Sequence, residues 1–288
     1  MNKELKLKKF FMAIMVMAAL LGSQAVMGQE TPGNAAEYND RGAWYLQNGQ
    51  FEQAIADFSQ SIRMNPNDPN IYHSRAFTYL ITGDFDRAIA DYNHILSIDP
   101  NNSRAYNNRG YTYHQKEDFT KAISDYSQAI KLNPNYIESY ENRGFAYLDS
   151  GDHNNAIADF TQAIKLEPKN TERYIQRGRA HASSGDYDKA IADYSQAIKL
   201  DKKSIEAYFR RAEAYANKED YKKSIADFNQ AQKLAPKNEA ILFWRGFIYY
   251  MSKDYKKALA DAEAALKINP DFFDAQRLKQ TCQDAMAK

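Results

Sequence analysis

The chain has 288 residues, enough for about two ordinary domains, and its 44% hydrophobic and 26% charged residues exclude a disordered chain. Its 38 Lys and Arg oppose 37 Asp and Glu, so it lacks the basic excess of a nucleic-acid-binding protein. The single cysteine, Cys282, excludes an intramolecular disulfide and a cysteine-rich metal site.

Residues 1–28 have the layout of a secretory signal peptide. Four lysines precede the apolar run from Phe10 to Gly22, and small residues follow it, which predicts cleavage after Ala25 or Gly28. The run of 13 residues is shorter than the roughly 17 to 25 that span a bilayer. No cysteine stands there to take a lipid. We therefore expect an exported chain, periplasmic or secreted from a bacterial cell envelope, which is not a lipoprotein and contacts a membrane only if the signal stays uncleaved.

After a linker at 29–34, the sequence repeats every 34 residues without an insertion. The seven rows are 35–68, 69–102, 103–136, 137–170, 171–204, 205–238 and 239–272, and residues 273–288 remain. Place 8 of each row holds Gly or Ala, place 20 holds Ala or Ser, and place 32 holds Pro in all rows except the fifth, where Lys202 stands.

Each row predicts two helices, which makes the chain all-α. Tyr38, Gly42 and Tyr45 fall on one helical face, and glycines such as Gly83 mark the end of the first helix. An Asp then caps the second helix, and the proline stops it. The place-8 glycines predict a close helix crossing that receives the small Ala of the second helix. Without the proline, the junction at Lys202 is expected to be looser or to continue as a longer helix.

This pattern of Tyr, Gly, Tyr, Ala, aromatic, Ala and Pro resembles the tetratricopeptide repeat family over residues 35–272. The resemblance implies seven stacked helical hairpins that form a right-handed superhelix with a concave groove, closed by a capping helix at 273–288. Stacking is also expected on physical grounds, because one hairpin cannot bury its apolar face alone.

Most aromatic residues are assigned to packing. Places 4, 11, 17 and 24 each hold Tyr or Phe in six of the seven rows, which accounts for 24 of the 38 aromatic residues. The family's groove is lined by first-helix residues at places 2, 5, 9, 12 and 13, and the resemblance therefore implies a peptide-binding groove here. We assign to it Asn39, His73, Phe77, Asn107, Tyr111, His114, Glu141, Phe145, Arg179, Phe209, Phe243 and Phe247. The alternative is that the first-helix aromatics thicken the core between adjacent repeats.

Charged residues also repeat. Every row has Arg at place 7 and Asp at place 23, which predicts a structural ladder of ion pairs within or between repeats, including Arg109, Arg143, Arg177, Asp125, Asp159 and Asp193. A stripe of arginines for an anionic ligand is the less favoured interpretation, because each Arg has a matching Asp.

The sequence contains no catalytic motif and predicts no enzyme activity, cofactor or metal site. We expect a non-catalytic adaptor or scaffold that binds a protein or peptide, and neither nucleic acid nor a small-molecule substrate. The alternative is a homo-oligomeric scaffold that assembles head to tail. It rests on opposed charges, with 12 basic and 19 acidic residues in 29–170 against 22 and 17 in 171–288.

Overall fold

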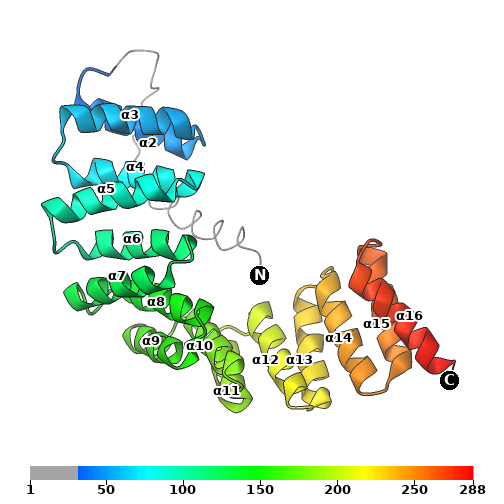
Figure 1. Cartoon of the computed structure of the whole chain (residues 1–288). Coiled ribbons are helices and arrows are strands. Elements are labelled where there is room, and N and C mark those ends of the chain that lie inside the picture. The colour runs from blue at the N-terminus through cyan, green and yellow to red at the C-terminus, as the bar shows by residue number, and fades with distance from the viewer. Residues whose placement is uncertain (1–31, 288) are drawn as a thin grey trace. The chain divides into compact units, whose positions relative to one another are not determined.

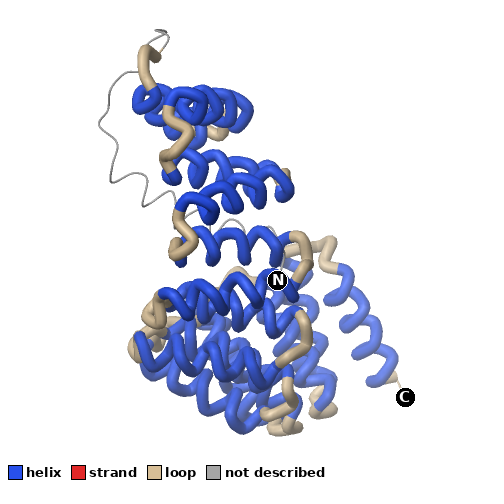
Figure 2. Tube along the Cα trace, turned by 60° about the vertical axis from the view of Figure 1, so that its left-hand side comes forward, coloured by secondary structure: helices blue, strands red, loops and turns tan. Residues whose placement is uncertain are grey.

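The computed structural model describes residues 32–287, so the predicted signal peptide lies outside the described residues. Every regular element within this range is an α-helix, and short loops connect the helices (Figures 1 and 2). No helix in this range is both long enough and apolar enough to cross a bilayer.

The chain divides into two compact units, each a stack of helical hairpins. Unit 1 ends at Asn133 and unit 2 begins at Pro134. In unit 1 the helices are α2 (Ala35–Gln47), α3 (Phe51–Met64), α4 (Pro69–Thr82), α5 (Phe85–Ile98), α6 (Ser103–Gln115) and α7 (Phe119–Leu132). In unit 2 they are α8 (Ile137–Asp149), α9 (His153–Leu166), α10 (Thr171–Ser183), α11 (Tyr187–Leu200), α12 (Ile205–Asn217), α13 (Tyr221–Leu234), α14 (Glu239–Met251), α15 (Tyr255–Ile268) and α16 (Phe273–Met286). The predicted all-α stack of hairpins is confirmed.

The turn inside each hairpin follows the predicted chemistry. Asp220 caps α13 by accepting a hydrogen bond from the backbone N–H of Lys223, and the five other place-16 aspartates cap their helices in the same way. The preceding residue has a positive φ, such as 80° at Gly83. Rows without glycine there adopt the same strained conformation, with φ of 60° at Glu219 and 66° at Lys253.

The expectation of a longer helix near Lys202 is wrong. Helix α11 has 14 residues and ends at Leu200, at the same place in its row as α7 at Leu132. The turn after the helix forms without the proline. Asp201 accepts a hydrogen bond from the backbone N–H of Lys203 at 2.9 Å, as Asp99 does from Asn101 at 3.0 Å in a row that has the proline.

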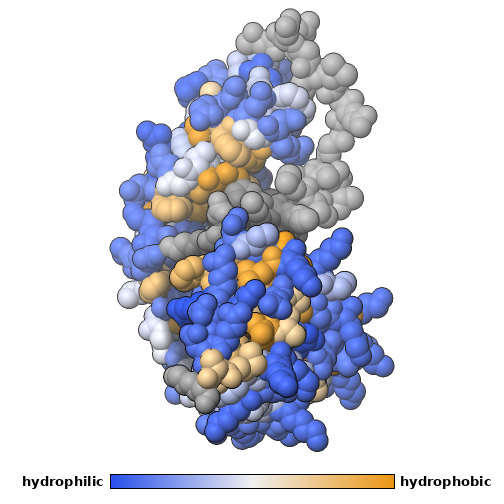
Figure 3. All heavy atoms as spheres, turned by 90° about the vertical axis from the view of Figure 1, so that its right-hand side faces the viewer, coloured by the Kyte–Doolittle hydropathy of each residue, from blue (hydrophilic) through white to orange (hydrophobic). Residues whose placement is uncertain are grey.

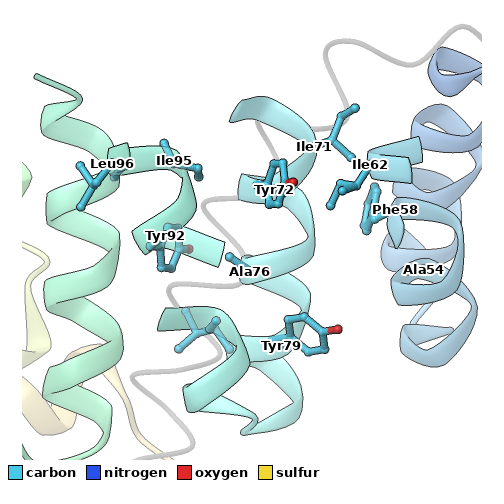
Figure 4. Close-up of a cluster of buried hydrophobic side chains, with 13 residues drawn as sticks. Ala54, Phe58, Ile62, Ile71, Tyr72, Ala76, Tyr79, Tyr92, Ile95 and Leu96 are labelled. Carbon is cyan, nitrogen blue, oxygen red and sulfur yellow. The ribbon is translucent and has the colours of Figure 1, made fainter. Parts of the chain in front are cut away.

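Stacking buries apolar side chains in clusters within and between neighbouring hairpins of each unit. Figure 4 shows Ile71 of α4 near Ile62 of α3, while Tyr92 of α5 lies on the other side of α4. Tyr72 of α4 packs on His94 of α5, with ring centroids 4.1 Å apart. Residues from three successive rows thus share one cluster, which is why a single hairpin would leave its apolar face exposed.

The place-8 glycines do face the second helix, but their closest neighbour differs from the prediction. A Cβ built on Gly178 would lie 2.6 Å from the ring of Tyr194, and one on Gly144 would lie 3.0 Å from the ring of Phe160. The place-24 ring is thus the nearest neighbour of the glycine in four rows. The predicted place-20 alanine is also in contact, because the backbone oxygens of Ala122 and Ala258 lie 3.2 Å from a Cβ built on Gly110 and on Gly246. An aromatic ring reaches farther than a methyl group, so it meets the glycine first.

Helix α16 is the first half of an eighth row. Ala275, Leu278 and Cys282 stand at places 3, 6 and 10 and are buried against α14 and α15. Gln276 and Gln280 occupy places 4 and 8, where complete rows have Tyr or Leu and Gly or Ala, respectively. Because no second helix follows within residues 32–287, these two places are polar and exposed.

Candidate functional site

The twelve residues assigned to the groove all lie on first helices, six in each unit. Asn39 is on α2, His73 and Phe77 are on α4, and Asn107, Tyr111 and His114 are on α6. Glu141 and Phe145 are on α8, Arg179 is on α10, Phe209 is on α12, and Phe243 and Phe247 are on α14. Adjacent first helices contact each other within a unit, as α10 does α12. We call the side of these helices that carries the twelve residues the first-helix surface.

In unit 1 the first-helix surface is polar and largely occupied by its own contacts. Asn108 donates a hydrogen bond of 2.6 Å from Nδ2 to Nε2 of His73, which links α6 to α4. Burial, with Arg104 nearby, lowers the pKa of His73 to about 3, so this imidazole is neutral and accepts the bond. Asn107 is buried, and its amide donates to Asn108 Oδ1 at 3.2 Å.

The unit 1 aromatics on this surface contribute to the core. Phe77 and Tyr111 are half-buried and pack against the cluster drawn in Figure 4. Burial raises the pKa of Tyr111 to about 12. His114 lies edge-on to Phe119 with ring centroids 5.5 Å apart. These contacts agree with the alternative in which first-helix aromatics thicken the core.

The first two rings of unit 2 have the same role. Phe145 packs edge-to-face on Phe160, and Phe209 packs edge-to-face on Phe228, with ring centroids 5.3 Å apart in both pairs. Each ring thereby covers the place-24 ring of its own hairpin.

A cluster of partly exposed rings lies at α12 and α14, and we call it the aromatic surface: Phe209, Phe243, Trp244 and Phe247. Trp244 joins the other three, with ring centroids 6.4, 5.4 and 5.9 Å from those of Phe209, Phe243 and Phe247. Trp244 and Phe247 are each 36% exposed. Figure 3, viewed from the side of α16, shows hydrophobic residues at the surface among hydrophilic ones.

Sequence reasoning missed Trp244, although a signal was present. The family's lining places do not include place 6, and the other rows hold polar residues there, such as Gln176 and Arg210. A large aromatic at that place, beside Phe243 and Phe247, was the departure that could have identified it.

Charged groups lie beside the aromatic surface on α12. Arg210 lies over the ring of Phe209, with its guanidinium carbon 5.9 Å from the ring centroid. It also donates to Glu213 at 2.9 Å and lies 3.8 Å from Glu206. Arg210 therefore interacts with two carboxylates and with one aromatic ring.

Another charged pair joins α8 to α10. Arg173 contacts Glu141 at 2.7 Å and also pairs with Glu167. Burial raises the pKa of Glu141, and the arginine opposes that shift. Arg179 donates to Gln176 at 2.7 Å on the same helix.

The seven Arg and Asp pairs form, each within its own row. They are Arg41 with Asp57, Arg75 with Asp91, Arg109 with Asp125, Arg143 with Asp159, Arg177 with Asp193, Arg211 with Asp227, and Arg245 with Asp261. Every arginine donates from Nε and Nη2 to the two carboxylate oxygens, at 2.6 to 2.9 Å. The aspartates are at least 90% buried as side chains.

The remaining guanidinium nitrogen links neighbouring rows. At the five junctions inside the two units, Nη1 donates to the place-25 side chain of the preceding row. The acceptors are Ser59, Asn93, Thr161, Ser195 and Asn229, at 2.6 to 3.2 Å. Tyrosines at places 4 and 11 flank the guanidinium, as Tyr208 and Tyr215 do at Arg211. Because each of these guanidinium groups donates to both oxygens of its own aspartate and to a side chain of the preceding row, we assign these arginines a structural role.

The residues described by the structure hold no group of three or more His, Cys, Asp or Glu side chains arranged to bind a metal ion. The described histidines do not gather, and His181, which replaces a tyrosine beside Arg177, lies 4.0 Å from Asp193.

Three kinds of tetratricopeptide repeat model match the sequence. One matches residues 42–82, 78–117, 110–151 and 178–219, a second matches 205–238 and 239–272, and a third matches 137–170. The chain belongs to the tetratricopeptide repeat family. A search of curated proteins finds no match to it.

Solved structures of similar fold include other repeat proteins. The C-terminal part of a repeat protein from Cytophaga hutchinsonii has a TM-score of 0.69 and 21% identity, covering 83% of this chain and 98% of that one. MamA has a TM-score of 0.54 and 28% identity over 59% of this chain and 92% of its own. YrrB, described as having an unusual peptide-binding site, has a TM-score of 0.53 and 18% identity over 66% of this chain and 97% of its own.

Proposed function

We propose that this tetratricopeptide repeat protein is an exported, non-catalytic adaptor that binds a peptide or partner protein on its first-helix surface. Family membership supports an interaction role, since such repeats present extended binding surfaces. Export rests on the sequence of residues 1–28.

The observation that carries the proposal is the exposure of the aromatic surface. Most aromatic rings in the repeats serve packing, yet Trp244 and Phe247 each leave about a third of their surface to solvent on the same side of α14. Large partly exposed rings surrounded by polar groups are the usual anchors of protein interfaces. The ladder arginines are occupied by aspartates, which leaves the rings and their polar neighbours as the binding groups.

The test is a pull-down from a cell-envelope extract with three purified proteins: wild type, Trp244→Ala with Phe247→Ala, and Trp44→Ala. Trp44 is 45% exposed on α2 at place 10 and serves as the matched control. We expect the double variant to lose proteins that wild type and the control retain. Identical recovery by all three would reject binding on this surface.

Self-assembly through the oppositely charged halves is the second proposal. Helix α16 covers the apolar face of the last hairpin, so such assembly would depend on exposed charges and weaken with salt. Light scattering at low and high salt tests it, and a monomer at every salt concentration would reject it.

A further inference from the structure

Basic and acidic residues are distributed unevenly between the first helices of unit 2 and the rest of the unit. Residues 134–287 contain sixteen lysines, and none of them lies on α8, α10, α12 or α14. These four helices carry seven carboxylates: Glu138, Glu141, Asp149, Glu172, Glu206, Glu213 and Glu239. Apart from the ladder, they carry three arginines: Arg173, Arg179 and Arg210. Apart from the ladder, the first helices of unit 2 are therefore acidic, although the unit as a whole is nearly neutral, with 24 basic and 23 acidic residues in 134–287.

The helix dipole explains only some of these acidic residues. Four of the seven lie in the first turn of their helices, where a carboxylate is favourable: Glu138, Glu172, Glu206 and Glu239. Glu213 lies in the third turn of α12, where the dipole gives no such benefit. It shares Arg210 with Glu206, so one negative charge of the three groups is left uncompensated beside Phe209.

Arg210 shows what kind of group this surface accommodates. Its guanidinium lies over the Phe209 ring and between two carboxylates, one 2.9 Å and the other 3.8 Å away. Among the residues that the structure describes, no Lys or Arg lies over the neighbouring rings of Trp244 and Phe247. Both rings are partly exposed. A Lys or Arg placed on Trp244 would gain a ring contact of the same type and attraction from the acidic groups on α12.

We infer that the aromatic surface of unit 2 binds a basic peptide segment, with Lys or Arg beside a large apolar side chain. The inference rests on the proposed function and specifies the chemistry of its partner. The cation is attracted by the one uncompensated negative charge of Glu206, Arg210 and Glu213, and the apolar side chain packs on Trp244 and Phe247. An acidic segment would be repelled by Glu206 and Glu213.

Fluorescence anisotropy with three labelled twelve-residue peptides tests this inference. The first alternates Lys and Phe with Gly and Ser, the second has Glu for Lys, and the third has Ala for Phe. We expect the second and third to bind the full chain at least about tenfold more weakly than the first. Binding of the first should weaken as salt rises from about 50 to 500 mM.

Variants assign the binding to named residues. Trp244→Ala with Phe247→Ala, and separately Glu206→Gln with Glu213→Gln, should each weaken binding of the basic peptide at least about fivefold. The controls Trp44→Ala and Glu52→Gln lie on α2 and α3 and should have no effect. Circular dichroism confirms that each variant folds.

Three results would overturn the inference: equal binding of the acidic peptide, no binding of any peptide, or the same loss in the control variants. If the pull-down still depends on Trp244 and Phe247 in that case, the adaptor function stands and its partner has another chemistry. If the basic peptide binds as expected but no extract protein depends on these rings, the adaptor proposal fails while the chemical preference stands.

Discussion

Arg211 and Asp227 form a bidentate ion pair that also ties one repeat to the next. Nε and Nη2 of the arginine donate to the two carboxylate oxygens at 2.7 Å each, and Nη1 donates to Ser195 of the preceding repeat at 2.9 Å. The hydrogen bonds to Asp227 raise the pKa of Arg211 against the effect of burial. One side chain thus fixes both the hairpin and its junction.

Replacing the carboxylate should be costly. Asp227→Asn keeps the shape but leaves a guanidinium, 19% exposed as a side chain, without its counter-charge. We expect a loss of about 2 to 4 kcal/mol in the free energy of unfolding, measured by urea denaturation. Asp188→Asn is the control, because Asp188 pairs with Lys218 while 79% exposed, and it should lose less than about 1 kcal/mol. Equal losses would contradict a special role for the ladder.

The junction bond has its own, smaller contribution. Ser195→Ala removes the acceptor for Arg211 Nη1, and we expect a loss of about 0.5 to 1.5 kcal/mol in the same assay. Ser97, whose hydroxyl donates only to the backbone oxygen of His94 on an exposed part of α5, provides the comparison as Ser97→Ala. A larger loss at Ser97 than at Ser195 would argue against the inter-repeat tie.

Packing between the two helices of a hairpin is tight at place 20. Ala156 is fully buried with Phe160 and Ala180, so Ala156→Leu should overpack the crossing and cost about 1 to 3 kcal/mol. Ala158 is exposed on the same helix, and Ala158→Leu should leave the melting temperature nearly unchanged. An unchanged melting temperature for Ala156→Leu would show that the crossing has spare room.

Cys282 should report on the docking of α16. It is fully buried, and burial raises the pKa of its thiol. A reagent in solution therefore reaches the sulfur poorly, and only a small fraction of the thiol is present as thiolate. We expect a thiol reagent at pH 8 to react with the native protein at least roughly a hundredfold more slowly than with the urea-unfolded chain. Similar rates in both states would mean that α16 undocks readily.

His73 should make stability depend on pH. Its pKa in the folded state is about 3, below the ordinary 6.5, so the unfolded chain binds a proton that the folded chain rejects. The contribution of neutral His73 is complete above about pH 6.5 and is lost as the pH falls toward 3. Urea midpoints should drop less between pH 7.5 and 5 in His73→Gln than in wild type. Burial also lowers the pKa of His181, so some dependence remains in the variant. The same drop in both proteins would contradict this role for His73.

Helix positions could be predicted from sequence because their signals are local. Asp220 and Gly83 act on the turn in which they stand, so a row alignment suffices to find them. Contacts between rows are harder, since the alignment gives residue types but not which atoms meet after stacking. The small polar residues at place 25, including Ser195, were visible in the sequence, but their role required the position of Arg211. For the same reason the place-24 ring over Gly178 was missed.

The candidate site was less predictable than the fold. The expected lining residues lie on first helices, yet exposure separates Phe247 from Asn107, which has the same kind of assignment but is buried. Burial depends on side chains in adjacent rows, so it cannot be predicted from the place that a residue occupies in its own row. Trp244 lies outside the family's lining places and becomes part of the surface only through its contacts with Phe209 and Phe243.

Helix α16 uses the same junction as the complete repeats, in a simplified form. Lys279 stands at place 7, where every row has Arg, and it contacts Glu263 at place 25 of the last row at 3.2 Å. Within residues 32–287 no place-23 aspartate follows α16, and a single charged contact stands where the complete rows have the bidentate arginine. For protein engineering this makes the junction an interchangeable connector. A 34-residue unit inserted between two rows inside a unit would meet compatible places on both sides, so the length of the binding surface could be changed without redesigning the cap.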